Sequence, residues 1–193
     1  MIWDFNIRLF HILLIIIVST SIITAKNGYM ILHEISGVTL LCIVIFRIFW
    51  GFFGTHYAKF SNFNLNYKSI KKFFQDQEYN FFGHNPLGSI SIISMLMIII
   101  VITISGLFSS DDIFYDGPLV RFAPKQTSFF TKIHDLSHYV LYFLITIHLI
   151  AVIYYQFYKK KLIIHQMIDG RSRDQHFKSK KISRKKIKSG LFI

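Results

Sequence analysis

Long uncharged apolar blocks alternate with polar segments along most of this chain. The four blocks are residues 7–25, 31–53, 87–109 and 129–157. Each block is long enough to cross a bilayer as a helix, which takes about 20 residues. The segments between the blocks suit helices that run antiparallel to their neighbours. The pattern therefore predicts an all-α membrane protein, a four-transmembrane-helix up-and-down bundle.

Composition supports this prediction and divides the chain in two. Of the 193 residues, 52% are hydrophobic, which is too apolar for a soluble domain of this size. We expect a membrane domain over 1–158 and a basic tail over 159–193. The first apolar block could instead be a secretory signal peptide, but its leading segment is net neutral and no A-x-A site follows it. The single cysteine, Cys42, excludes a disulfide within one chain.

The distribution of charge predicts the orientation. The net charge is +12, and twelve lysines and arginines follow Tyr158. The loop between the second and third blocks adds Lys59, Lys68, Lys71 and Lys72. The positive-inside rule then places this loop and both termini in the cytoplasm. For a membrane protein, we interpret the basic tail as a determinant of topology and a contact for anionic lipid rather than for nucleic acid.

The fourth block carries histidines at two depths. His134 and His148 are fourteen positions apart, so on a helix they point roughly the same way, about 21 Å apart along the axis. His138 is a third candidate. Ionisable groups inside lipid are costly and need partners, so each of these histidines requires an explanation.

Depth pairs the histidines of the fourth block with those of the first two. His11 lies in the inner half of the first block, and His33 lies in the outer half of the second. The pairing that matches depth is His11 with His148 and His33 with His134. Two bis-histidine sites stacked across a bilayer are what two haems need, and a four-helix bundle can hold a flat macrocycle. This interpretation predicts a di-haem b-type cytochrome.

Two further residues of the second block fit such a site. Gly37 follows His33 by one turn, where the absence of a side chain lets a flat ring approach the backbone. Arg47 follows His33 by fourteen positions, which should place it at the depth of the inner pair.

Two alternatives use the same histidines without haem. A transport protein would line an ion or metal path with them, and a zinc site could form on His134 and His138 alone. Helix geometry alone also allows either His134 or His138 to be the partner of His33. Shallow depth favours His134, because His33 lies close to the start of its own block.

Several stretches resemble the bacterial four-helix di-haem cytochrome b family, which includes the cytochrome b subunits of nickel–iron hydrogenases and small stand-alone relatives. The matching stretches, in family order, are WDFNIRLFH at 3–11, LHEISG at 32–37, FRIFWGFFG at 46–54, GHNPLG at 83–88, SGLFSSDDIFYDGPL at 105–119 and IHDLSHYVLYFLITIHLIAVIYY at 133–155. The resemblance spans the chain to about Tyr158. Ile12 departs from it, because the family commonly has tryptophan there.

The resemblance implies ligation of two non-covalent haems b by His11, His33, His134 and His148. It also implies a bacterial cytoplasmic (inner) membrane protein that passes electrons between quinone and a redox partner on the outer side. A c-type cytochrome or a hydrogenase-like oxidoreductase subunit would be such a partner.

Charged residues suggest further roles within that picture. Arg8 and Arg47 are candidates to pair with haem propionates, although snorkelling toward the interface explains them nearly as well. The acidic residues of the outer loop are candidates for docking a basic partner. The alternative is that they are simply solvated loop residues. They are Asp111, Asp112 and Asp116. His84 is a candidate neighbour of a quinone or a propionate, and capping of the loop is an equally good explanation for it.

Overall fold

Four long helices form the protein, and the sequence prediction of a four-helix membrane bundle is confirmed. The computed structural model describes residues 4–56, 58–63, 65–75, 86–111, 115–160 and 162–169. The long helices are α1 (Phe5–Lys26), α2 (Met30–Phe53), α4 (Pro86–Leu107) and α5 (Thr127–Ile153). In the described part of the chain, these four are long and apolar enough to span a bilayer. Their ends lie within a few residues of the predicted blocks, and α5 continues as a π-helical segment, η4 (Tyr154–Tyr158).

Short elements occupy the connections. At the end of the bundle where α1 begins, here called the inner end, these are the 3-10 turn η1 (Phe60–Asn62) and the helices α3 (Tyr67–Gln75) and α6 (Ile163–Asp169). At the opposite end, here called the outer end, two 3-10 turns, η2 (Val120–Phe122) and η3 (Pro124–Gln126), lead into α5. His84, Asp112 and the basic tail from residue 170 onward lie outside the described residues.

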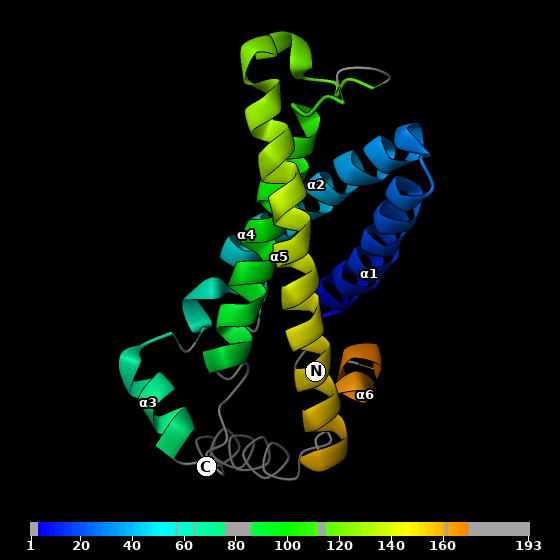
Figure 1. Ribbon diagram of the computed structural model, residues 1–193. Coiled ribbons are helices and arrows are strands. Elements are labelled where there is room, and N and C mark those ends of the chain that lie inside the picture. The colour runs from blue at the N-terminus through cyan, green and yellow to red at the C-terminus, as the bar shows by residue number, and fades with distance from the viewer. Residues whose placement is uncertain are drawn as a thin grey trace, which may run out of the picture.

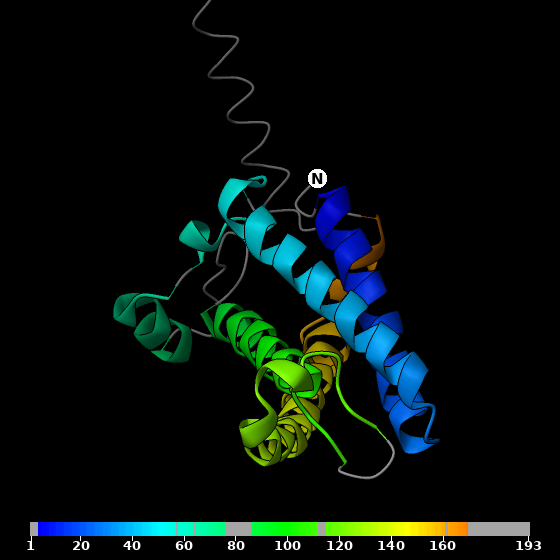
Figure 2. The ribbon, with the colours of Figure 1, turned by 90° about the horizontal axis from the view of Figure 1, so that it is seen from above.

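The helices are arranged as two antiparallel pairs, α1 with α2 and α4 with α5 (Figures 1 and 2). A tight turn joins α1 to α2, where Gly28 adopts a φ of 74° that favours glycine. The two pairs meet mainly through α2 and α4. The backbone of α5 packs along α4 and comes less close to α1 and α2. Helix α3 stands to the side of the bundle (Figure 1).

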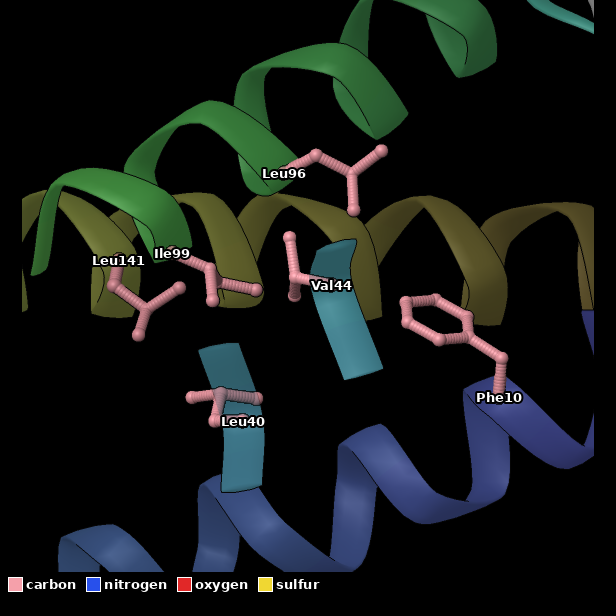
Figure 3. Close-up of a cluster of buried hydrophobic side chains, with 6 residues drawn as sticks. All are labelled: Phe10, Leu40, Val44, Leu96, Ile99 and Leu141. Atoms are coloured by element: carbon pink, nitrogen blue, oxygen red, sulfur yellow. The ribbon is translucent and has the colours of Figure 1, made fainter. Parts of the chain in front are cut away.

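The packed core lies largely at mid-depth, between the levels of the two histidine pairs, and reaches the level of His11 at Phe10. All four long helices contribute to it, and Figure 3 shows its buried members: Phe10, Leu40, Val44, Leu96, Ile99 and Leu141. Most other large apolar side chains of the helices are exposed. Such an outward-facing apolar surface is expected where lipid, rather than water, surrounds the bundle. The core thus fixes the helices at the level between the candidate sites.

Candidate functional site

At the inner level, α1 and α5 bring two histidines face to face. The ring centroids of His11 and His148 are 6.4 Å apart, with an angle of 54° between the ring planes. Both rings are partly buried between the helices. His11 adjoins Phe10 of the core, whereas His148 lies two turns inward from Leu141.

At the outer level, α2 and α5 bring together a second pair. The ring centroids of His33 and His134 are 6.1 Å apart, and the rings are nearly perpendicular, at 81°. The structure therefore brings together the same two pairs that depth matching predicts from the sequence. Their role as ligands stays a prediction at this point.

The spacing of both pairs suits one metal ion between two imidazoles. With metal–nitrogen bonds of about 2.0 Å and about 1.1 Å from nitrogen to ring centroid, two imidazoles on opposite sides of a metal have centroids about 6 Å apart. The centroid distances of both pairs, 6.4 and 6.1 Å, match this value. Direct ring contacts also fall in this range, as for Phe46 and Trp50 at 6.0 Å, so the spacing fits a metal ion without requiring one.

Hydrogen bonds define the tautomer of both outer histidines. Nδ1 of His33 lies 2.9 Å from the carbonyl oxygen of Ser21, and Nδ1 of His134 lies 2.8 Å from that of Ile102. Because a carbonyl oxygen only accepts, each Nδ1 carries the proton and donates it. The lone pair is then on Nε2, which is the arrangement of a histidine that binds a metal.

Gly106 makes room for one of these rings. A Cβ at Gly106 would lie 2.9 Å from Cε1 and 3.0 Å from Nδ1 of His134. The imidazole of His134 thus rests against α4, where its Nδ1 reaches the Ile102 carbonyl.

Gly37 and the two arginines leave room and donors for a bound group. Apart from the backbone of its own helix and its chain neighbours, no atom lies within 4 Å of the position that a Cβ would take at Gly37. Arg47 is only 4% exposed, and it donates from one nitrogen to the Ala58 carbonyl at 3.3 Å. Its other terminal nitrogen is buried without a partner, as is Nε of Arg8. Buried unpaired donors are costly, so both arginines suit an anionic group at the inner level.

A contact at the inner end, which the sequence analysis misses, ties α1 to α2. Asp4 caps α1 by accepting from the Ile7 backbone at 2.7 Å, and it also accepts from Trp50 Nε1 at 3.0 Å and from the Thr55 hydroxyl. Burial alone would raise the pKa of Asp4, but these hydrogen bonds together hold it below its ordinary value. The ionised carboxylate thus fixes the depth of α1 against α2.

A second missed contact ties the outer loop to α2 beside the outer pair. The Tyr115 hydroxyl donates to the carboxylate of Glu34 at 2.6 Å, and Glu34 directly follows His33. Burial, followed by the hydrogen bond and the charge of Glu34, raises the pKa of Tyr115 well above its ordinary value, so the hydroxyl stays a donor. Local sequence patterns do not predict this contact, because 81 positions separate its two partners.

His138 takes no part in either pair. Its ring contacts those of Tyr139 and Tyr142, with centroids 4.0 and 5.5 Å away. No group of three or more histidine, cysteine or acidic side chains that could hold a metal ion occurs among the described residues. The geometry therefore offers little support for zinc on His134 and His138.

Comparison with known families decides the class of protein. The family model for prokaryotic cytochrome b561 matches residues 2–170. This chain belongs to the prokaryotic cytochrome b561 family. The cytochrome is therefore a membrane b-type cytochrome that transfers electrons and binds haem b, as the resemblance implies. No curated protein and no solved structure matches this cytochrome significantly.

The residues of this cytochrome fit the cofactor of its family. Paired imidazoles at 6.4 and 6.1 Å match bis-histidine ligation of iron. The open space at Gly37 suits an adjacent macrocycle, and the unpaired nitrogens of Arg8 and Arg47 suit carboxylates. Haem carries both features on one group, a flat ring and two propionates.

Proposed function

We propose that this cytochrome binds two haems b and carries electrons across the membrane between a quinone and a redox partner on the outer side. Two facing histidine pairs, at 6.4 and 6.1 Å, carry the proposal, and α5 supplies one member of each. His11 and His148 would hold the inner haem, and His33 and His134 the outer one. Haem b supplies one-electron redox chemistry when bound.

The chain's own residues orient and surround these groups. Ser21 and Ile102 bind the outer imidazoles through their carbonyls, which leaves each Nε2 as the nitrogen that would bind the iron. Arg8 and Arg47 would bind propionates at the inner level, and Gly37 would lie against the outer ring. The apolar core between the pairs excludes water and lowers the local dielectric.

The proposed orientation places both termini and α3 in the cytoplasm of a bacterial inner membrane. It rests on the lysines and arginines that follow Tyr158 and those of the inner loop. The outer partner, a c-type cytochrome or a hydrogenase-like subunit, would approach the loop that contains Asp111 and Asp116. Both aspartates are exposed and also shape that loop, by accepting from the Tyr115 backbone and the Ser110 hydroxyl.

Paired histidine variants test the ligand assignment. We expect His134→Ala to lose one of two haems, because His134 is the imidazole that faces His33, with ring centroids 6.1 Å apart. His138→Ala is the matched control on the same helix, and it should retain both haems, because its ring packs on tyrosines. Haem per protein, from pyridine haemochrome spectra of the purified variants, measures the effect.

The reverse result, with haem lost from His138→Ala and kept in His134→Ala, would exchange the assignment. Two haems in both variants would remove His134 and His138 from the ligand set altogether.

A further inference from the structure

Helix α3 carries apolar and basic residues on opposite faces. At about 100° per residue, Tyr67, Ile70 and Phe73 fall within about 120° of one another around the helix axis. The lysines of α3 fall within about 100° on roughly the opposite side; they are Lys68, Lys71 and Lys72. A helix with aromatic and aliphatic residues on one face and lysines on the other is typical of helices that lie in a membrane interface.

The protein covers the apolar face of α3 only in part. Ile70 and Phe73 are half-buried, and Tyr67 is 77% exposed. The main contact of α3 with the long helices is α4, and α3 otherwise stands to the side of the bundle (Figure 1). A helix of nine residues is marginal in water by itself. A further apolar surface beside this face would therefore stabilise α3.

The connection that leads to α3 is fixed at the membrane boundary. The ring of Phe60 in η1 packs directly on Gly51 of α2, where a Cβ would clash with it, and the Arg47 guanidinium lies 4.8 Å from the centroid of the same ring. Figure 1 shows α3 at the level where α4 begins and α5 ends. Tyr154 and Tyr158 are exposed at that end of α5, and tyrosine is enriched where a membrane meets water. A lipid surface is thus within reach of α3.

The basic face of α3 is complementary to anionic lipid. Lys68, Lys71 and Lys72 are all exposed. The helix contains no acidic residue, so its positive charge is not offset within the helix itself. A lysine close to an anionic membrane surface strengthens binding by about fivefold.

From the two faces and their position we infer that α3 lies on the membrane surface at the inner end, with its apolar face toward the acyl chains and its lysines on anionic phospholipid headgroups. This inference goes beyond electron transfer, because it assigns lipid binding to the connection between α2 and α4. It depends only on the place of α3 at one end of the spanning helices, so it holds for either orientation of the bundle.

Amide hydrogen exchange of α3 in lipid nanodiscs tests the inference on the full haem-loaded chain. One nanodisc contains phosphatidylcholine alone, and the other contains equal parts of phosphatidylcholine and the anionic lipid phosphatidylglycerol. We expect exchange of the α3 amides to be slower by about 100-fold in the anionic nanodisc, from about fivefold for each of the lysines. About 1 M salt should remove most of this difference, because it screens exposed charges. Equal exchange in the two nanodiscs would overturn the inference.

Charge variants at the two ends of the bundle separate the face of α3 from net charge. Lys68→Gln combined with Lys71→Gln should reduce the lipid-dependent difference to about fivefold. Lys125→Gln combined with Lys132→Gln is the matched control, because it removes the same charge from exposed positions at the outer end, and it should leave the difference unchanged. Haem content verifies that each variant is folded. An equal reduction in both double variants would also overturn the inference, since the lipid would then respond to net charge alone.

Discussion

Replacement of Gly106 by alanine should weaken the outer haem while leaving the helix intact. The new Cβ would lie 2.9 Å from Cε1 of His134, whereas ordinary contacts begin at 3.4 Å. The ring must therefore move by about 0.5 Å, which stretches its 2.8 Å bond to the Ile102 carbonyl to about 3.3 Å, beyond the usual limit. Overpacking of this kind costs about 1–3 kcal/mol. We expect roughly 10- to 100-fold weaker retention of the outer haem.

Haem transfer to an excess of a soluble haem-binding protein measures this retention. The free energy of unfolding of the apoprotein serves as a second reading, because alanine is favoured over glycine in a helix by about 1 kcal/mol. Folding should therefore hold or improve while the outer haem is lost faster. Ile104→Ala is the matched control on α4, since its side chain is 41% exposed and two positions on a helix turn it about 200° away from Gly106. Equal haem retention in Gly106→Ala and the parent protein would refute the reasoning.

Two further predictions concern stability and topology. Asp4→Asn should lower the melting temperature at pH 7, and the difference from the parent protein should vanish in acid. The pKa of Asp4 is depressed below 3.8 in the folded protein, so its contribution is present above that pH and is lost as pH falls through the folded value; a difference that persists at the lowest pH would contradict this. Reporter fusions after Lys71 should report the cytoplasm, and fusions after Asp116 the outer side; the opposite pattern would invert the bundle.

Periodicity and depth were enough to predict the helices and the histidine pairs. The local composition of a segment is enough to predict a membrane-spanning helix. The blocks at 7–25 and 31–53 accordingly match α1 and α2 within two residues. The pairing of His11 with His148 follows from helix direction alone, because antiparallel helices bring residues of equal depth together. Helix α3 was missed, since its nine residues lie in a loop of mixed aromatic and basic composition.

Contacts between distant side chains could not be predicted from the sequence. The hydrogen bond between Glu34 and Tyr115 depends on how the outer loop folds back, and nothing near either residue encodes that path. The same holds for Asp4, whose carboxylate meets Trp50 only after α1 and α2 have packed. Likewise, only the structure shows that the ring of His134 packs against Gly106.

The number of haems per protein tests the central claim most directly. A pyridine haemochrome assay on the purified full chain, with protein determined by amino-acid analysis, should give two haems b per chain, bound without covalent attachment, because the chain's single cysteine rules out a C-x-x-C-H motif. Two haems are expected because the structure contains two histidine pairs with room for iron, at 6.4 and 6.1 Å. One haem per chain, or none in folded protein, would contradict the account.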